Sequence, residues 1–517
     1  MTRTTGAEGL LMLAPLGFEA RAIRRGLRKI PGDLRVERTG MGPRRSRGAA
    51  MRAAGTPARA VAVAGVCGAL DPSLRPGHVV VASEVRGPDG TTVLPGAGLV
   101  LAAVRSLGLT AAMGPVLSMD HLARRRERAE LAATGAIAVD MESAWLAPAA
   151  AGRPFAVLRV VSDTPRHGLL DIPATVSGGL TALRTLRRAA PALARWAAAA
   201  EPRTVLLAGP RSFCAGVERA IEVVERALDR YGPPVYVRKQ IVHNVHVVRD
   251  LERRGAVFVD ALEEVPPEAL VVFSAHGVSP QVRQEANHRN LKVIDATCPL
   301  VTKVHSEAKR FARAGYTIVL VGHEGHEEVE GTTGEAPEAI RLIERADQID
   351  ELEVDGNGDG PVAYLTQTTL AVDEVTDVVE ALRARFPDLA GPGSDDICYA
   401  TSNRQDAVKV LARESDAMLV IGSGNSSNSK RLVEVSAREG CPAWLVDDET
   451  EIDPAWLVGA GTVTVTAGAS APEVLVDRVV AALRSLGPVT VEERQVMDES
   501  VQFTLPIELR RATSRTE

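Results

Sequence analysis

Three of the five cysteines stand in matching contexts, each at the predicted start of a helix. Cys298 follows an apolar run that is typical of a strand, and Pro299 suits the first position of a helix. Cys214 also follows an apolar run, whereas glycine and proline residues precede Cys398. Because the unpaired N–H groups at a helix start lower the pKa of a thiol, we expect each cysteine to favour the thiolate that binds metal.

The spacing of these three cysteines along the chain indicates three related α/β units, each contributing one sulfur to a shared centre. Three thiolates suit an iron–sulfur cluster with one iron left open, because a structural zinc site prefers four protein ligands. The alternative is three unrelated buried cysteines. Cys67 and Cys441 stand in other contexts. We expect Cys67 to be a small buried residue rather than a nucleophile, and Cys441 to be a bystander rather than a fourth ligand.

A second set of polar residues follows predicted strands in the same part of the chain. His243, His276 and His326 lie in strand-to-loop positions, and each alone would be read as an ordinary loop histidine. A strand at 418–421 leads into a turn, 422–429, that is built from glycine, serine and asparagine. Free N–H groups, hydroxyls and an amide at such a turn favour a phosphate site without a P-loop lysine, and histidines add donors and charge.

The elements that position these residues follow from the apolar patterns. Strands at 9–15, 61–66 and 79–82, glycine turns and a closing helix predict an α/β domain over residues 1–200. An alanine-rich segment then suggests a linker, with a domain boundary near residue 202 and a second α/β region over 203–517. In the helix after Cys398, we expect Ala407, Val410 and Leu411 to face the core.

Composition limits the class of protein. The chain has 517 residues, too many for one core, and 45% hydrophobic content with a net charge of −6 argues for a soluble globular protein rather than a nucleic-acid binder. No apolar run reaches the length of a transmembrane segment, and the apolar patch near the start predicts a first strand rather than a signal peptide. Few, scattered cysteines favour a reducing, cytoplasmic location.

The first domain carries three recognisable segments in order. They are Thr39-Gly-Met-Gly42, Ala133 to Ser143 with its Asp-Met-Glu sequence, and Leu158-Arg-Val-Val-Ser-Asp163-Thr. This order resembles the nucleoside phosphorylase and nucleosidase family over residues 10–195. The resemblance implies that Met141 and Glu142 grip a ribose, that Asp163 protonates the leaving purine, and that Glu19 lies near a water-activating position. The alternative is that Glu142 and Asp163 are surface or helix-cap residues.

The second region carries a longer series of ordered motifs over residues 204–510. They are Phe213-Cys-Ala-Gly-Val217, Val242-His-Asn244, Ser274-Ala-His-Gly-Val278, Asp295-Ala-Thr-Cys-Pro299, Gly325 to Thr332, Thr366-Gln-Thr-Thr369, Cys398-Tyr-Ala-Thr401 and Asn425-Ser-Ser-Asn428. The series resembles the 4-hydroxy-3-methylbut-2-enyl diphosphate reductase (IspH/LytB) family. The resemblance implies a three-lobed α/β fold around a [4Fe-4S] cluster, and the last step of the non-mevalonate isoprenoid pathway.

The same resemblance implies a role for each matching residue. It assigns Cys214, Cys298 and Cys398 to the cluster, Glu328 to delivery of the proton that releases water, and Thr368 to the position beside it. It assigns the diphosphate to His243, His276, Ser426, Ser427, Asn428 and Ser470, places His326 at the same pocket, and counts Thr368 among the substrate-binding residues. It also implies ferredoxin or flavodoxin as the electron donor.

Two positions depart from that family's pattern. Ser212 stands where the family often has glycine, and Glu327 where it often has proline. Glu327 places a second carboxylate beside Glu328, where it either raises the pKa of Glu328 or faces solvent.

These observations predict a two-domain enzyme: a phosphorylase-like three-layer α/β domain ahead of a three-lobed, pseudo-threefold α/β reductase. The predicted function is reduction of the diphosphate with a second, nucleoside-cleaving activity. One alternative is a reductase whose first domain is a catalytically silent scaffold. The other is an iron–sulfur redox carrier or sensor, which the hydroxyl- and histidine-rich phosphate site argues against.

Overall fold

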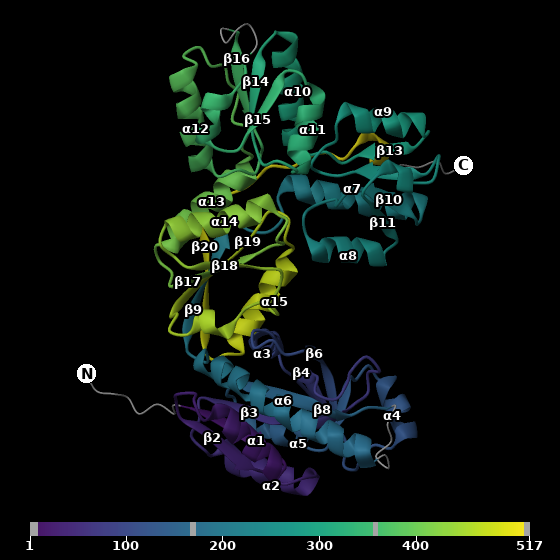
Figure 1. The fold of residues 1–517 in the computed structure, drawn as a ribbon, viewed down its shortest axis with the longest axis vertical. Coiled ribbons are helices and arrows are strands. Elements are labelled where there is room, and N and C mark those ends of the chain that lie inside the picture. Colours follow the sequence, from purple (N-terminus) through teal and green to yellow (C-terminus); the bar gives the residue numbers. More distant parts are fainter. Residues whose placement is uncertain (1–8, 166–171, 355–359, 511–517) are drawn as a thin grey trace, which may run out of the picture. The chain divides into compact units, whose positions relative to one another are not determined.

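The structure is a computed structural model that describes residues 9–165, 172–354 and 360–510 (Figure 1). The chain forms two compact units. One holds the chain up to Val205 together with Asp448–Val463 and Asp477–Glu492, and the other holds the remainder. The boundary near residue 202 therefore stays a prediction. Within the described ranges, no helix is both long enough and apolar enough to cross a membrane.

The first unit is built on a mixed eight-stranded sheet. Its strands run in the order β2-β1-β3-β7-β6-β4-β5, with β8 paired to both β3 and β4. The strands are β1 (Leu10–Ala14), β2 (Leu34–Arg38), β3 (Ala60–Ala69), β4 (Val79–Gly87), β5 (Gly90–Val93), β6 (Ala111–Ser118), β7 (Ala138–Asp140) and β8 (Phe155–Asp163). The three strands predicted from the sequence are confirmed as β1, β3 and β4. Their near-continuous apolar runs match strands that are buried on both faces.

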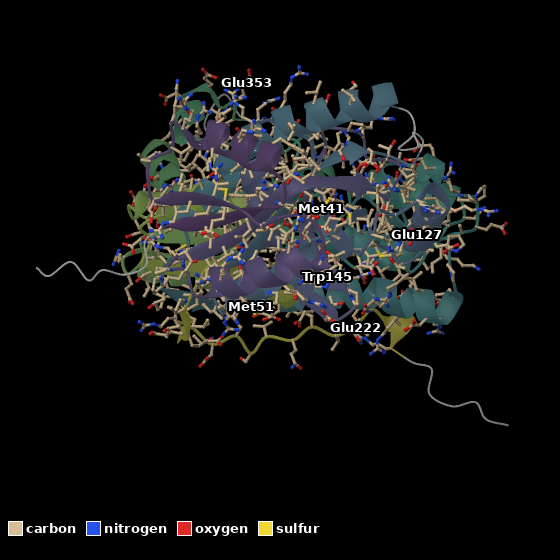
Figure 2. The ribbon with its side chains drawn as sticks, turned by 90° about the horizontal axis from the view of Figure 1, so that it is seen from below. Met41, Met51, Glu127, Trp145, Glu222 and Glu353 are labelled. Atoms are coloured by element: carbon tan, nitrogen blue, oxygen red, sulfur yellow. The ribbon has the colours of Figure 1, made fainter. Side chains whose placement is uncertain are left out.

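Helices cover this sheet. They are α1 (Gly17–Leu27), α2 (Pro43–Ala54), α3 (Ala97–Arg105), α4 (Arg125–Ala132), α5 (Ser143–Leu146) and α6 (Ile172–Ala198). The closing helix α6 packs against α1, α3 and β8, and buries Leu186, Leu193 and Trp196. Among the side chains labelled in Figure 2, Trp145 is buried while Met51 is 75% exposed.

From Arg203 onward the chain forms three further sheets. Their orders are β11-β10-β12-β13, β15-β14-β16 and β18-β17-β19-β9-β20, and the first two are wholly parallel. The strands are β9 (Arg203–Gly209), β10 (Val235–Arg238), β11 (Ala256–Val259), β12 (Leu270–Phe273), β13 (Lys292–Asp295), β14 (Thr317–Val321), β15 (Ile340–Ile343), β16 (Val362–Thr366), β17 (Ala417–Ile421), β18 (Ala443–Val446), β19 (Thr462–Ala467) and β20 (Val489–Gln495). The α/β class predicted from the sequence is confirmed.

Helices connect and cover these strands. They are α7 (Ala215–Tyr231), α8 (Val245–Arg253), α9 (Pro280–His288), α10 (Pro299–Arg313), α11 (Glu327–Glu335), α12 (Val372–Arg385), α13 (Tyr399–Ala412), α14 (Ser427–Arg438) and α15 (Glu473–Arg484). Helices α7, α10 and α13 each begin directly after one of the three singled-out cysteines.

The predicted core face of α13 is wrong at one position. Ala407 and Leu411 are buried as expected, but Val410 is 44% exposed, and Val408 takes the core position. The buried arc of this helix is centred between Ala407 and Val408, and at about 100° per residue Val410 falls outside it.

Candidate functional site

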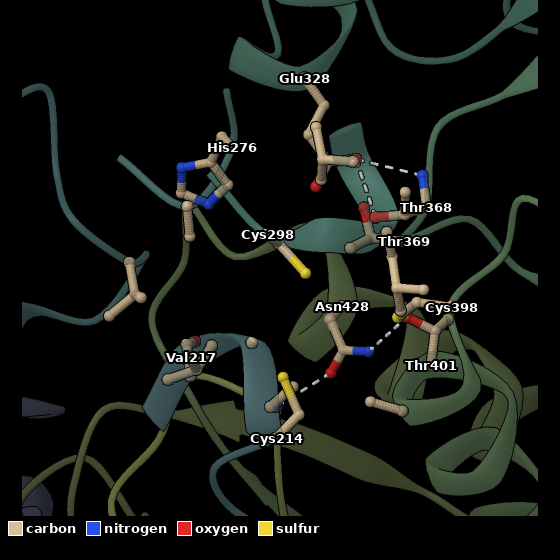
Figure 3. A pocket seen from close by; sticks show the side chains of 18 of the residues that line it. Cys214, Val217, His276, Cys298, Glu328, Thr368, Thr369, Cys398, Thr401 and Asn428 are labelled. Atoms are coloured by element: carbon tan, nitrogen blue, oxygen red, sulfur yellow. Dashed lines mark hydrogen bonds between the residues drawn. The ribbon is translucent and has the colours of Figure 1, made fainter. Parts of the chain in front are cut away.

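Three helix starts bring the three sulfurs to one pocket. Cys214, Cys298 and Cys398 are the N-cap residues of α7, α10 and α13, and all three line the same cavity (Figure 3). Gly216 preserves the space between them, because a Cβ there would lie 2.8 Å from the Cys298 Sγ and 3.8 Å from the Cys214 Sγ. Three soft sulfur donors around one cavity fit an iron–sulfur cluster with one iron free of protein ligands.

The expectation that these thiols have lowered pKa values is wrong for the protein without metal. Burial raises the pKa of Cys298 to about 12 and that of Cys398 to about 11, and it also raises the pKa of Cys214. The backbone N–H of Leu300 lowers the pKa of Cys298, as expected at a helix start, but burial has the larger effect. A buried thiol of this kind becomes a thiolate when a metal displaces its proton.

A chain of polar contacts links one sulfur to the serine-rich turn. The Thr401 hydroxyl lies 3.1 Å from the Cys398 Sγ and accepts a hydrogen bond from Asn428 Nδ2 at 3.3 Å. Asn428 Oδ1 in turn accepts the N–H of Ala469 at 3.2 Å. These contacts fix the orientation of the Asn428 amide, which lines the pocket between the sulfurs and the turn.

Helix N-termini also supply polar groups to the lining of the pocket, and these groups with their neighbours are called the anion wall below. Ser426 is the N-cap of α14, where its hydroxyl accepts the N–H of Ser429, and His326 is the N-cap of α11. Ser427 and Ser470 complete this wall, and the Ser470 hydroxyl donates to the carbonyl of His243 at 2.9 Å. Because helix starts present free N–H groups and positive potential, this wall suits an anion such as a phosphate.

The three predicted histidines lie together. The rings of His243 and His276 stack with centroids 4.0 Å apart, and the His326 ring meets them edge-on at 5.6 and 6.0 Å. Burial, with the charges of the neighbouring histidines, lowers the pKa of His243 to about 2, and burial lowers that of His326. Burial also opposes protonation of His276, but its hydrogen bond to Glu327 and the nearby carboxylates raise its pKa overall. Of the three rings, His276 is therefore the one whose surroundings favour protonation.

Glu328 and Thr368 form a buried pair on the same cavity. The Thr368 hydroxyl donates to Glu328 Oε2 at 2.9 Å, and the Thr368 N–H donates to the same oxygen at 3.1 Å (Figure 3). Both residues line the pocket, and Glu328 is only 6% exposed. Neither of these two hydrogen bonds involves the second carboxyl oxygen of Glu328, Oε1.

Arg404 holds the backbone just before Cys214 and was not predicted from the sequence. Its guanidinium is fully buried, donates to the Ser212 carbonyl at 2.7 Å, and pairs with Glu499 at 2.9 Å. Arg404 lies one turn before Val408, on the apolar face of α13, and a charged residue at such a position indicates a paired buried charge. Ser212 itself has a φ of 59°, a left-handed conformation that favours glycine.

A second cluster lies in the first unit, around a fully buried arginine. Arg159 Nη2 lies 2.7 Å from Asp140 and 3.4 Å from Glu142, and its Nε donates to the Ser143 hydroxyl at 3.1 Å. A Cβ on Gly65 would meet both Arg159 Nη1 and Glu19 Oε1, at 2.6 and 2.7 Å. Glu19 and Glu142 therefore share one buried neighbourhood.

Burial controls the charge of these two carboxyls. It raises the pKa of Glu142 to about 7, although Arg159 opposes the shift, and it raises that of Glu19. Glu19 accepts the N–H groups of Leu16 and Val66 at 2.7 and 2.8 Å, so its position is fixed by the backbone. Glu142 is 5% exposed, so the interpretation of Glu142 as a surface residue is wrong. It does stand at the N-cap of α5, as the helix-cap alternative expected, although its side chain makes no capping hydrogen bond.

Asp163 lies at the end of β8 with a cationic partner. Arg128 of α4 pairs with its carboxylate, and the Ser162 hydroxyl donates to the same carboxylate at 2.8 Å. Arg128 is buried and lies against Gly68. Both arginines were missed: Arg159 stands alone in an apolar strand, which is a signal of a paired buried charge, whereas Arg128 is hidden in a basic run.

Comparisons with known proteins agree with this division. A family model described as LytB protein matches residues 205–484, and one described as Phosphorylase superfamily matches residues 32–197. A relative from Zymomonas mobilis named 4-hydroxy-3-methylbut-2-enyl diphosphate reductase is 54% identical over 60% of this chain and 91% of its own length. A relative of the same name from Xanthomonas euvesicatoria is 57% identical over 59% of this chain and 97% of its own length.

A solved structure is similar as well. It is described as the E-1-hydroxy-2-methyl-but-2-enyl-4-diphosphate reductase from Plasmodium falciparum, and it is 36% identical with a TM-score of 0.57. The match covers 60% of this chain and 97% of that one.

Proposed function

The chain belongs to the LytB family, whose model spans more than half of its length, and from this premise we infer that it reduces 4-hydroxy-3-methylbut-2-enyl diphosphate. The products are isopentenyl and dimethylallyl diphosphate. The reaction consumes two electrons and two protons: the C–O bond breaks, the hydroxyl leaves as water, and a C–H bond forms. The observation that carries this inference is the single pocket that holds three thiols, three imidazoles and the serine-rich turn.

The family is one of iron–sulfur enzymes, and we propose that Cys214, Cys298 and Cys398 hold a [4Fe-4S] cluster. When bound, such a cluster supplies the electrons and one iron that no protein ligand occupies. The chain contributes three helix starts whose N-cap cysteines all line one cavity.

The diphosphate is proposed to bind the anion wall. His243, His276 and His326, with Ser426, Ser427, Asn428 and Ser470, provide its donors. The buried Nδ1 of His243 has no hydrogen-bond partner in the described part of the chain, which is the kind of atom that a bound ligand satisfies. The start of α14 and a cationic His276 supply positive charge.

Glu328 is proposed to deliver the proton that turns the substrate hydroxyl into leaving water. Thr368 holds Oε2 through its hydroxyl and its N–H, which leaves Oε1 for the proton. Thr368 thus fixes the carboxyl group in one rotamer next to the ligand. The electrons are proposed to come from ferredoxin or flavodoxin, in a reducing cytoplasm that keeps the thiols free.

The test is anaerobic turnover with an artificial reductant. Protein purified without oxygen is expected to convert the substrate to the two C5 diphosphates, and E328Q to lose most of this activity. Absence of turnover in protein that contains iron and sulfide would refute the reductase assignment. A cluster signal that ignores added diphosphate would support the carrier alternative instead.

A second activity is proposed for the N-terminal domain predicted at residues 1–200, ahead of the reductase domain predicted at 203–517. The match of residues 32–197 to the Phosphorylase superfamily and the buried Glu19–Glu142–Arg159 cluster favour cleavage of a nucleoside. In this proposal Met141 and Glu142 hold the ribose and Asp163 protonates the leaving base. That role requires the Arg128–Asp163 ion pair to open. Release of a free purine from nucleosides tests it, and no release from any nucleoside would favour a silent scaffold.

A further inference from the structure

Glu327, the first residue of α11, turns its carboxylate toward a histidine of the diphosphate pocket. Its Oε2 lies 3.2 Å from His276 Nδ1 and accepts the hydroxyl of Ser274 at 3.3 Å. His276 is 9% exposed, and the Glu327 side chain 17%. The sequence had left Glu327 to act on Glu328 or to face solvent, and the structure instead pairs it with His276.

We propose that Glu327 is a positioning residue that holds a proton on His276 Nδ1 and keeps Nε2–H of the same ring available to the diphosphate. The inference rests on the proposed reductase function and deepens it. It adds to the anion site a carboxylate that never touches the ligand itself.

The reason lies in the chemistry of imidazole. A neutral ring carries one proton, so a ring with Nδ1–H facing a carboxylate would present an acceptor nitrogen to the phosphate oxygens. Only the imidazolium donates from both nitrogens. Burial alone would lower the pKa of His276, but the hydrogen bond and charge of Glu327, with the charge of Glu328, raise it. The shared pair also lowers the pKa of Glu327.

The surrounding groups favour protonation of His276 over that of the other two rings. His243 lies against its ring face and is kept neutral. His326 accepts the N–H of Glu328 through Nδ1 at 3.2 Å, which leaves its single proton on Nε2. Glu328 faces His276 from α11, and Lys239, after β10, acts on Glu327.

A cation site built from the same atoms is the competing explanation. Ligand atoms of His243, His276 and Glu327 all lie within 4.8 Å of one another. However, the two rings stack at an interplanar angle of 17°, so their in-plane lone pairs run side by side rather than converge. The geometry therefore favours a hydrogen-bonded pair over a chelate.

The experiment compares anaerobic holoenzyme with its E327Q variant, using inorganic diphosphate as the probe in calorimetry across neutral pH. E330Q, an exposed carboxylate in the same first turn, is the matched control. We expect E327Q to bind diphosphate about tenfold more weakly at pH 7.5 and to raise KM similarly, with kcat changed less than twofold. In the unaltered protein affinity should fall as pH rises through the pKa of His276. In E327Q that fall should begin at lower pH, and the two proteins should converge in acid.

Two results would overturn the inference. One is an E327Q protein whose affinity and pH profile match those of E330Q. The other is loss of diphosphate binding on treatment with a chelator that leaves the cluster intact, with recovery on adding Zn²⁺. If the unaltered protein neither binds diphosphate nor turns over, the proposed function itself fails. If the unaltered protein turns over normally and E327Q has no effect, only the role of Glu327 is refuted.

Discussion

Replacing Thr368 by valine removes one hydroxyl from the proton-donating pair and little else. The side chains have nearly the same shape, and the backbone N–H of Thr368 still reaches Glu328 Oε2 at 3.1 Å. The change therefore isolates the 2.9 Å hydrogen bond from the hydroxyl to that oxygen. Both residues are buried, and the valine methyl group occupies the place of the lost hydroxyl, so bulk water does not readily replace the donor.

The expected magnitude follows from this geometry. A hydrogen bond to a charged group contributes about 1.5–3 kcal/mol, and the Glu328 carboxyl group gains negative charge as it gives up its proton. If it is used to hold the Glu328 carboxyl group in the transition state, its loss lowers kcat by about 10- to 100-fold. The affinity for inorganic diphosphate and the iron content should stay unchanged, because neither depends on this hydroxyl.

The assay is anaerobic turnover with T368V, T368S and T376V. Thr376 is exposed on α12, where its hydroxyl bonds only a helix carbonyl, so T376V controls for the substitution itself. T368S keeps the hydroxyl and should retain most of the rate. Equal kcat for T368V and T376V would refute the reasoning that this hydroxyl positions the acid.

Three further predictions concern other parts of the chain. C298S should lose most of the bound iron and the turnover, whereas C441A should keep both because Cys441 packs in an apolar core; equal iron in the two would contradict the ligand assignment. E142Q should unfold at higher temperature than the unaltered protein at pH 8 and not at pH 4. Glu142 binds its proton more tightly in the folded state, so the free energy of unfolding falls by about 3 kcal/mol as pH rises from 4.5 to about 7. Glutamine cannot ionise and removes this loss. A difference in unfolding temperature between the two proteins that widens in acid would contradict the prediction. R128A should speed purine release relative to R126A, because Asp163 no longer has to leave an ion pair; a slower release would show that Arg128 assists instead.

Local pattern was sufficient to predict much of the fold. Apolar runs, glycine turns and Pro299 fixed the strands and the helix starts that carry the cysteines, because these signals act within a few residues. The grouping of thiols, histidines and the serine-rich turn was predicted from matching contexts and from the family resemblance. The structure brings those residues to one pocket.

What failed depends on contacts distant in sequence. Helix starts predicted acidic thiols, but the three-dimensional burial of Cys298 outweighs its local N–H groups. Glu327 could be placed only once His276, far away in the chain, was seen beside it. Arg159 signalled itself by interrupting an apolar strand, whereas Arg128 gave no local sign of its partner Asp163.

The central claim is that the iron–sulfur cluster and the diphosphate bind in one cavity. The decisive measurement is the low-temperature spectrum of the iron centre in oxygen-free protein, recorded before and after addition of the substrate diphosphate. The account predicts about four irons per chain and a spectrum that changes when the diphosphate binds. Iron-free protein, or a signal identical with and without the diphosphate, would contradict it.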